Sequence, residues 1–282
     1  MLIVTTVPAL RSRREELRRR GLRLALVPTM GGLHEGHLAL VRRGRELADE
    51  VWASIFVNPT QFGPGEDFAR YPRDFEHDRD LLADAGAALV FAPSVQEVYP
   101  KPSATVIDLP ALAGGMCGAF RPGHFRGVAL VVTKLLNMAQ PDVAIFGAKD
   151  WQQAAVIRRL VADLHMPVAI DVAPTVREED GLAMSSRNAY LSAEERRAAT
   201  VLIRALRAAE AAVAAGERRG AVLEALLAGE VGIEGLARLQ YVAAADPDTL
   251  ASVADGATRI LLALAVFIGG TRLIDNLLVE VK

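Results

Sequence analysis

Two histidines, His34 and His37, lie in a glycine-containing turn that could bind phosphate. The turn reads P-T-M-G-G-L-H-E-G-H over residues 28–37, between an apolar run at 22–27 and a segment with helical spacing. Strand, turn and helix start form the arrangement in which α/β proteins bind nucleotide phosphates, because the helix N-terminus exposes N–H groups. At this spacing both imidazoles can face one side of the helix. As imidazolium groups they could donate to phosphate oxygens and neutralise a leaving pyrophosphate.

A zinc site does not fit these histidines. The zinc motif H-E-x-x-H places its histidines four residues apart, whereas His34 and His37 are three apart. No cysteine or carboxylate cluster stands nearby in the sequence to complete a metal site. Two ordinary surface histidines are the simpler alternative, but their place in a strand-to-helix turn favours phosphate chemistry.

A second candidate group is the stretch G-A-K-D-W-Q-Q at residues 147–153, directly after an apolar strand at 142–146. Lys149 could hold a β- or γ-phosphate, and Asp150 could cap the next helix or contact a ligand hydroxyl. Gln152 and Gln153 are adjacent, so at most one of them is expected to point into a site. A solvated turn would explain Lys149 and Asp150 equally well.

A third candidate group is D-G-L-A-M-S-S-R-N at residues 180–188. The hydroxyls of Ser185 and Ser186 and the guanidinium of Arg187 could grip a phosphate, since a guanidinium can donate two hydrogen bonds to phosphate oxygens. Loops containing two serines are common, so the motif alone is weak. Its expected place at a domain boundary would let it close over a nucleotide.

Neutral side chains follow the next predicted strand, residues 51–57. Asn58, Gln61 and Phe62 combine amides with an aromatic ring, which suits a polar, hydroxylated small molecule. A turn-forming Asn-Pro pair is an alternative explanation for Asn58 but not for Gln61. Further along, R-P-G-H-F-R at 121–126 could add positive charge for a carboxylate or phosphate, and Cys117 has no base near it in the sequence.

The segments that must position these residues alternate between strands and helices. Strands are expected at residues 22–27, 51–57, 87–91, 142–146 and 168–171, and helices at 74–85, 127–138 and 151–164. An earlier helix is expected from Thr6 to Gly21, with Pro8 in its first turn. This alternation predicts βαβ units around a parallel sheet. Residues 93–122 lack periodicity and form a long connection of the kind that often covers a site.

The pattern changes near Pro174. Ser192 and Glu195 form a capping box that should open one long alanine-rich helix ending near Gly216. A shorter helix at 221–228 and strands at 239–243, 260–266 and 273–279 should follow. We therefore predict a Rossmann-like α/β domain at residues 1–175 and a smaller α+β domain at 176–282 that closes over the active site.

The composition excludes several classes of protein. The net charge of −2 over 282 residues argues against a general binder of nucleic acid or anionic membranes. Cys117 is the only cysteine, so no internal disulfide can form, as expected in a reducing cytosol. The first residues lack the pattern of a signal peptide, and no stretch approaches the ~20 apolar residues of a membrane helix. These features predict a soluble cytoplasmic protein.

Taken together, the motifs resemble those of the pantoate–β-alanine ligases, or pantothenate synthetases. The resemblance rests on P-T-M-G-G-L-H-E-G-H, V-N-P-T-Q-F, R-P-G-H-F-R-G-V, F-G-A-K-D-W-Q-Q, D-G-L-A-M-S-S-R-N and T-R-L-I-D-N, in that order. H-x-G-H alone marks only a nucleotidyltransferase superfamily that is related in fold to class I aminoacyl-tRNA synthetases. The set in this order is specific to the family and covers almost the whole chain.

The resemblance implies a reaction in two steps. The pantoate carboxylate attacks the α-phosphate of ATP, with magnesium, and gives pantoyl adenylate and pyrophosphate. The β-alanine amine then attacks the acyl carbon and releases AMP and pantothenate. The resemblance also implies a homodimer formed through the larger domain.

The resemblance also implies roles for single residues. His37 would be the proton donor with His34 assisting, Gln61 would contact pantoate and β-alanine, and Gln153 would contact pantoate. The implied ATP-binding residues are Met30, Gly31, Gly32, Leu33, His34, Glu35, Gly36, His37, Gly147, Ala148, Lys149, Asp150, Val176, Met184, Ser185, Ser186 and Arg187. The implied catalytic set is His34, His37, Lys149, Ser185, Ser186 and Arg187, with Asn58 and Phe62 added for substrate binding; no magnesium ligand is assigned.

One departure concerns Ala183, which stands where the loop of the synthetases has its first lysine. The family itself lacks that lysine, so Lys149 and Arg187 would have to supply the positive charge. Three alternatives remain open. A nucleotidyltransferase that acts on a phosphorylated acceptor would need a basic cluster, whereas residues 58–62 are neutral. An aminoacyl-tRNA synthetase is disfavoured by the short chain. A protein that only senses a nucleotide would not need amide side chains for an acyl substrate.

Overall fold

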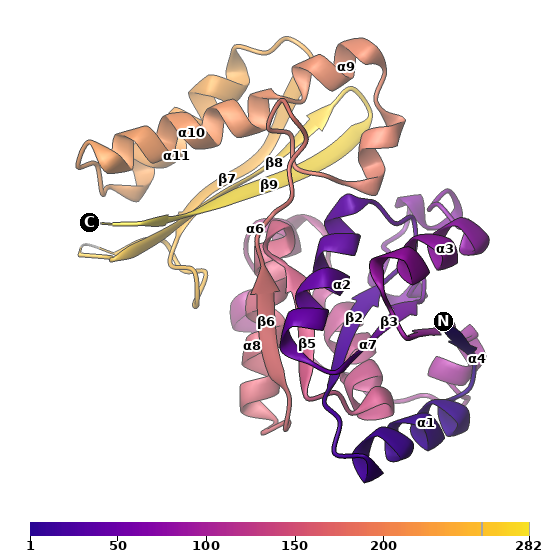
Figure 1. Ribbon diagram of the computed structural model, residues 1–282. Coiled ribbons are helices and arrows are strands. Elements are labelled where there is room, and N and C mark those ends of the chain that lie inside the picture. The colour runs from indigo at the N-terminus through magenta and orange to yellow at the C-terminus, as the bar shows by residue number, and fades with distance from the viewer. Residues whose placement is uncertain (255, 282) are drawn as a thin grey trace. The chain divides into compact units, whose positions relative to one another are not determined.

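The computed structural model describes residues 1–254 and 256–281, which divide into two compact units (Figure 1). The first unit contains residues 1–109, 121–147 and 156–174. The second contains residues 110–120 and 148–155 together with the chain from Thr175 onward. The division expected at residue 175 did not anticipate these two internal segments, one of which carries Lys149.

The first unit is built on a parallel sheet of six strands, in the order β1-β4-β3-β2-β5-β6. Its strands are β1 (Leu2–Val4), β2 (Leu24–Thr29), β3 (Glu50–Ile55), β4 (Leu89–Phe91), β5 (Val143–Gly147) and β6 (Ala169–Ala173). The Rossmann-like α/β class expected from the alternation is confirmed. The sequence analysis missed β1, because a strand of three residues is too short to show a period.

Helices cover this sheet. They are α1 (Val7–Arg19), α2 (Glu35–Leu47), α3 (Phe75–Ala85), α4 (Val95–Val98), α7 (His124–Ala139) and the later part of α8 (Trp151–Asp163). Leu38 and Val41 of α2 and Leu82 of α3 share one buried cluster with Val27 and Val90 of the strands. This packing fixes the start of α2 at the carboxyl end of β2.

The strand order places a topological switch between β2 and β5. From β2 the chain runs to β3 and β4 on one side, whereas β5 and β6 lie on the other side. Ligands of open α/β sheets bind outside the carboxyl ends of strands at such a switch. The histidine turn follows β2, and Gly147 ends β5.

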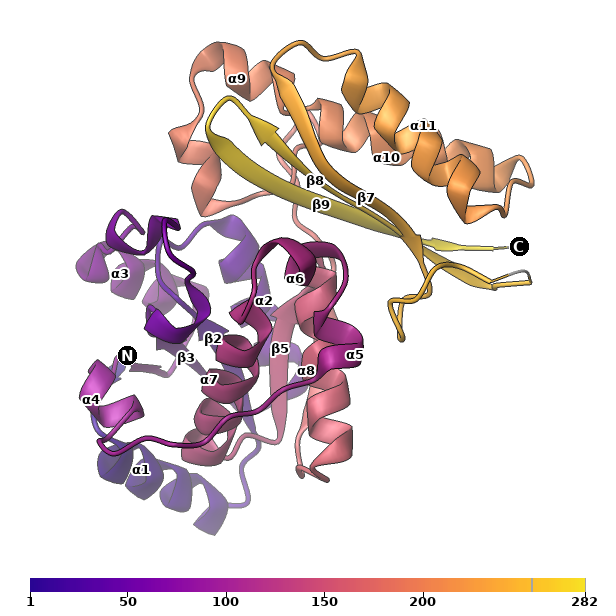
Figure 2. The same cartoon turned by 180° about the vertical axis from the view of Figure 1, so that it is seen from behind.

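The second unit has an antiparallel sheet of β7 (Ala237–Ala245), β8 (Arg259–Ile268) and β9 (Thr271–Glu280), with β8 in the middle. Helices α10 (Val201–Ala214) and α11 (Gly220–Gly232) run along one face of this sheet (Figure 2). Leu206 and Leu223 from the helices and Leu262 and Leu264 from β8 belong to one buried cluster. The expected smaller α+β region is therefore present.

The prediction of a single helix from Ser192 to Gly216 is wrong, because the structure has two helices there, α9 (Ala193–Ala198) and then α10. The predicted capping box is present, with Glu195 N–H donating to Ser192 Oγ at 3.2 Å. The break comes at Thr200, whose hydroxyl donates to the Arg197 carbonyl oxygen at 2.8 Å. This local bond competes with the regular helical hydrogen bonds.

The connection at 93–122, expected to be irregular, contains three short helices: α4, α5 (Pro110–Ala113) and α6 (Met116–Phe120). Short 3₁₀ turns complete the structure at Pro59–Gln61, Asp67–Ala69, Ala148–Asp150 and Ser186–Tyr190. Over residues 1–254 and 256–281, none of the helices has the length and apolar character needed to cross a membrane.

Candidate active site

The two histidines of the H-E-G-H turn cap helix α2. His34 is the N-cap residue, and its Nδ1 accepts the N–H of Gly36 at 3.1 Å. His37 Nδ1 accepts the N–H of His34 at 3.4 Å, and the centroids of the two rings lie 4.2 Å apart. The pair thus forms a capping box in which imidazoles take the places of serine and glutamate. The start of the helix holds both rings side by side.

The hydrogen bonds also define the tautomer of each ring. A ring nitrogen accepts a hydrogen bond only when it carries no proton, so a neutral ring in this geometry carries its proton on Nε2. Each ring is then a hydrogen-bond donor through Nε2. The sequence analysis expected imidazolium groups, but a doubly protonated ring would lose its cap.

Asp78 of α3 holds the glycine turn that precedes His34. Its carboxylate is 2% exposed and accepts the N–H groups of Gly32 at 2.9 Å and Leu33 at 2.8 Å. Gly31 has a φ of +81°, and a Cβ there would lie 2.8 Å from Asp78 Oδ2. Only glycine therefore allows the carboxylate to approach so closely. The sequence analysis missed Asp78, since no local pattern links it to a turn 46 residues earlier.

Asn58 and Gln61 form a buried amide pair after β3. Asn58 is 1% exposed; its Nδ2 donates to Gln61 Oε1 at 3.0 Å, and its Oδ1 accepts from Tyr99 Oη at 2.8 Å and from the Thr60 hydroxyl at 3.0 Å. The carboxamide of Asn58 is fully used inside the protein, so it orients Gln61 instead of making the predicted substrate contact. Gln61 Nε2 lies 3.0 Å from Met30 Sδ, which places this amide beside the turn before His34.

The R-P-G-H-F-R motif supports the Gln61 turn. Arg121 donates to both carboxylate oxygens of Glu66 at 2.7 Å, and His124 Nδ1 lies 2.8 Å from the Gln61 carbonyl oxygen. Burial raises the pKa of Glu66, but the hydrogen bonds and charge of Arg121 outweigh it and leave that pKa below its ordinary value. Arg126 pairs with Asp108. The positive charge expected here for a ligand is instead used within the protein.

Phe62 belongs to a group of aromatic rings. Its ring lies edge-on to Phe68 and Tyr71, with centroids 5.2 and 6.0 Å away, and Tyr71 Oη donates to the Gly31 carbonyl oxygen at 3.4 Å. Phe62 therefore packs against the glycine turn through Tyr71. Near the same turn is a cavity of about 320 Å³, lined by Met30, Gly31, Ile55, Phe56, Val57, Pro72, Arg73, Phe75, Asp78, Pro93, Ser94 and Val95.

In the second unit, the lysine turn forms the 3₁₀ turn Ala148–Asp150 before α8. Gln152 is 5% exposed and binds the backbone of residues 112–117, with its Oε1 accepting the Cys117 N–H at 3.0 Å. Gln153 is half-buried and makes no such bonds within the described chain. The sequence analysis expected at most one of the two glutamines to point into a site, and because the Gln152 side chain is bound to backbone groups, Gln153 is the candidate. The Trp151 indole donates to the Pro247 carbonyl oxygen at 2.8 Å.

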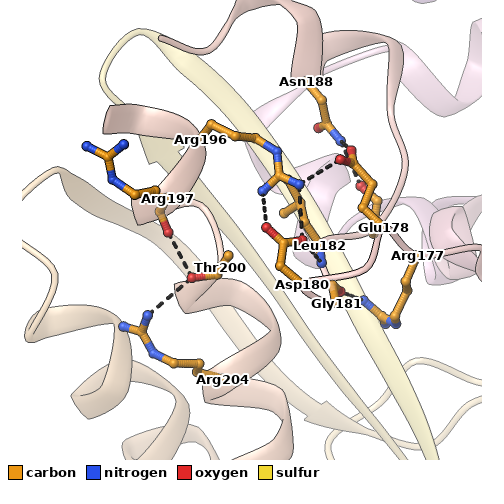
Figure 3. A network of polar contacts seen from close by, with 11 residues as sticks. Arg177, Glu178, Asp180, Gly181, Leu182, Asn188, Arg196, Arg197, Thr200 and Arg204 are labelled. Atoms are coloured by element: carbon orange, nitrogen blue, oxygen red, sulfur yellow. Dashed lines mark hydrogen bonds and ion pairs between the residues drawn. The ribbon is translucent and has the colours of Figure 1, made fainter. Parts of the chain in front are cut away.

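The segment at 176–188 is tied down by a network of charged groups (Figure 3). Arg196 of α9 donates to Asp180 and to Glu178, each at 2.6 Å, and its hydrogen bond lowers the pKa of Asp180. Asn188 Nδ2 donates to Glu178 Oε1 at 2.8 Å, and Met184 N–H donates to the Val176 carbonyl oxygen at 3.0 Å. The network holds both ends of the loop that carries the two predicted serines.

Within that loop, Ser185 Oγ accepts the Arg187 N–H at 3.3 Å and so caps the turn Ser186–Tyr190. Ser185, Ser186 and Arg187 are each partly exposed. The Oδ1 atom of Asn188 is buried and has no hydrogen-bond partner in the described part of the chain.

Known proteins match the chain over its full length. The sequence matches the family described as Pantoate-beta-alanine ligase over residues 2–278. The chain belongs to the pantoate–β-alanine ligase family. A pantothenate synthetase from Moorella thermoacetica is 54% identical over 282 residues, covering all of both chains. One from Roseiflexus sp. is 55% identical over 280 residues, covering 99% of this chain and all of that protein.

Solved structures of family members share the fold. A crystal structure of pantothenate synthetase from Thermus thermophilus matches with a TM-score of 0.93 at 47% identity and covers all of both chains. A pantoate–β-alanine ligase from Francisella tularensis, complexed with βγ ATP and β-alanine, matches with a TM-score of 0.80 at 33% identity. It covers 99% of this chain and 97% of that chain. This ligase therefore has the two-part α/β and α+β architecture of the family.

Proposed function

We propose that this ligase condenses (R)-pantoate with β-alanine at the expense of ATP, through pantoyl adenylate, and releases AMP and pyrophosphate. The observation that carries the proposal is the match to the pantoate–β-alanine ligase family over residues 2–278. The Francisella tularensis relative, solved with βγ ATP and β-alanine, supports the choice of two of the three substrates.

We assign the residues of the first unit to the phosphates and to pantoate. His34 and His37 donate hydrogen bonds through Nε2 to ATP phosphate oxygens and so stabilise the negative charge that develops on the leaving pyrophosphate. The turn from Met30 to Leu33 and the N-terminal residues Glu35 and Gly36 of α2 offer backbone N–H groups to the same ligand. Gln61, oriented by Asn58, contacts both pantoate and β-alanine, while Phe62 supports this part of the site by packing.

We assign the residues of the second unit to charge neutralisation. Lys149 and Arg187 hold phosphate oxygens, and the hydroxyls of Ser185 and Ser186 add hydrogen bonds. Displacement at phosphorus depends mainly on positioning and on neutralising charge, which these groups supply without a covalent nucleophile. Gln153 contacts pantoate, and the remaining ATP contacts come from Gly147, Ala148, Asp150, Val176 and Met184.

Magnesium is proposed to enter as the ATP complex, as part of the substrate. Mg²⁺ in such enzymes is commonly held by substrate phosphates, its own waters and one or two carboxylates. Across residues 1–254 and 256–281, no group of three or more His, Cys, Asp or Glu side chains is arranged to hold a metal ion. Bound to the ATP phosphates, the metal would reduce the negative charge of the nucleotide.

We further propose that the ligase acts in the cytoplasm as a homodimer formed through its larger N-terminal region. Both statements rest on membership of a biosynthetic enzyme family. The oligomeric state is tested by light scattering of the purified protein, where the mass of a single chain would contradict the dimer.

The test of the function is AMP formation by the purified protein. Pyrophosphate should appear only when ATP and pantoate are both present, and AMP and pantothenate only after β-alanine is added. Related hydroxy acids, tested in place of pantoate, report how selective the acid site is. Folded protein that leaves ATP unchanged with pantoate would overturn the proposal.

A further inference from the structure

The T-R-L-I-D-N stretch at residues 271–276 lies in β9, and its last residue contacts the lysine turn. Asn276 is 6% exposed, and its Nδ2 donates to the carbonyl oxygens of Ala148 at 3.0 Å and Lys149 at 2.8 Å. Both N–H groups of one carboxamide are thus used on two successive carbonyls. The backbone of the 3₁₀ turn is held directly at the residue that carries the ammonium group.

Asn276 is itself held by a buried ion pair. Asp275 is 2% exposed, and its carboxylate accepts from Arg177 Nη1 at 2.7 Å and Nη2 at 3.0 Å. Arg177 Nη2 also donates to the Asn276 carbonyl oxygen at 3.2 Å, and Asp275 Oδ1 accepts the Asn276 N–H at 2.8 Å. A two-pronged guanidinium–carboxylate contact fixes direction as well as distance. The backbone of Asn276 therefore has little freedom to shift along the strand.

The same ion pair reaches the serine-containing loop. Arg177 Nη1 donates to the Gly181 carbonyl oxygen at 3.1 Å, and the backbone of Arg177 pairs with Ala183, the residue before Met184. Asn276 therefore contacts the Lys149 turn directly, and Asp275 is connected through Arg177 to the start of the loop that carries Arg187. All of these residues belong to the second unit.

The contacts of Asn276 hold the backbone of Lys149 and not its side chain. The backbone around it is clamped, but its ammonium group has no ion pair or hydrogen bond to any other residue in the described part of the chain. A lysine side chain is long and flexible, so the place of its backbone limits the region that the charge can reach. A clamp at the carbonyls is therefore an effective way to direct the charge.

We infer that Asn276 is a positioning residue for Lys149 and that the Asp275–Arg177 pair holds Asn276 in place. The inference rests on the proposed role of Lys149 at the ATP phosphates. It gives the T-R-L-I-D-N stretch a function that needs no contact between Asn276 and a substrate.

The test combines Asn276→Ala and Lys149→Ala as single and double variants of the full chain. Misplacing a catalytic group by about 1 Å can cost about a hundredfold in rate, so Asn276→Ala should lower kcat/KM for ATP by about ten- to a hundredfold. The kcat/KM for β-alanine should change by less than about twofold, since the amine attacks after pyrophosphate has left. Pantoate-dependent pyrophosphate release measures the first step.

The double variant separates positioning from general damage. If Asn276 acts through Lys149, adding Asn276→Ala to Lys149→Ala should change the rate by less than about twofold, because coupled residues are not additive. An equal fold-loss in both backgrounds would overturn the inference and leave the role of Lys149 intact. A Lys149→Ala variant with the parental rate would overturn that role and the inference together.

Two further variants guard against misfolding. Asn276→Asp keeps the size of the side chain but removes both N–H donors, so it should also lower kcat/KM for ATP. Asn137→Ala is the matched control, since the exposed Asn137 donates to a single carbonyl within α7, that of Thr133 at 2.9 Å. It should keep the parental rate. Parental kinetics in a folded Asn276→Asp variant would overturn the inference.

Discussion

At the scale of single residues, the side chains of His34 and His37 each have two functions. The Nδ1 atoms of His34 and His37 each accept a backbone N–H at the start of α2, so a neutral ring carries its hydrogen-bond donor on Nε2. A serine at the N-cap would satisfy the same backbone group but could not donate to phosphate from the same place. Histidine therefore combines helix capping with a directed donor at the start of α2.

This division can be tested with two substitutions of His34. His34→Ala removes the cap and the ring, so it should lower the free energy of unfolding by about 1 kcal/mol and the adenylation rate at least tenfold. His34→Ser restores an acceptor for the Gly36 N–H, so its stability should return to near the parental value while the rate stays low. Chemical denaturation and pyrophosphate release provide the two measurements. A fully active His34→Ser variant would show that the ring is not needed.

At the scale of elements, helix α7 and the turn at 58–61 approach each other so closely that only glycine can occupy position 127 of the helix. A Cβ on Gly127 would overlap the Thr60 carbonyl oxygen and would lie 2.7 Å from Gln61 Cα. Both neighbours are backbone atoms, which cannot rotate away as a side chain would. The position of Gln61 thus depends on the absence of a side chain in a helix far along the chain.

Gly127→Ala should therefore displace the 58–61 turn. Overpacking of this kind typically costs about 1–3 kcal/mol, and the KM for pantoate should rise because Gln61 moves with the turn. Denaturant unfolding and steady-state kinetics report the two effects. The control is Gly229→Ala in α11, where nothing lies within 4 Å of the added Cβ and a gain of up to about 1 kcal/mol is expected. Equal behaviour of the two variants would contradict this account.

At the scale of the whole molecule, the second unit is assembled from three separated parts of the chain. Phe120 stacks on Tyr241 with centroids 6.0 Å apart, Trp151 donates to the Pro247 carbonyl oxygen, and Asn276 binds the carbonyls of Ala148 and Lys149. Segments 110–120 and 148–155 thus complete the same face of the small sheet. A cut at the division expected from sequence would remove them both.

A fragment of residues 176–282 should consequently be less stable than the same region in the full chain. It would expose the sheet face that Phe120 covers, and burial of apolar surface contributes roughly 25 cal/mol per Å². Hydrogen exchange of the β7–β9 amides in the fragment and in the full chain makes the comparison. Equal protection in both would contradict the three-part unit. As a control, a peptide of residues 110–120 is added in excess to the fragment, where it should partly restore the protection of these amides.

Much of the fold was predictable because it follows from local patterns. The alternation of apolar runs with helical segments indicated the parallel sheet, and the Ser192–Glu195 capping box was correctly placed. The helix break at Thr200 was not predicted, because the competing bond to the Arg197 carbonyl does not alter the hydrophobic pattern. Strand β1 was missed because its pairing with β4 is a property of the sheet.

The sequence by itself determined which chemical groups are present and their local setting: histidines in a strand-to-helix turn, a lysine after a strand and a Ser-Ser-Arg loop. Only the tertiary structure decided which residues hold these chemical groups in position. Asp78 holds the glycine turn from 46 residues away, and Asn276 holds the Lys149 turn from 127 residues away. Spacing along a chain encodes helix and strand periods, whereas contacts between distant segments depend on how the elements pack.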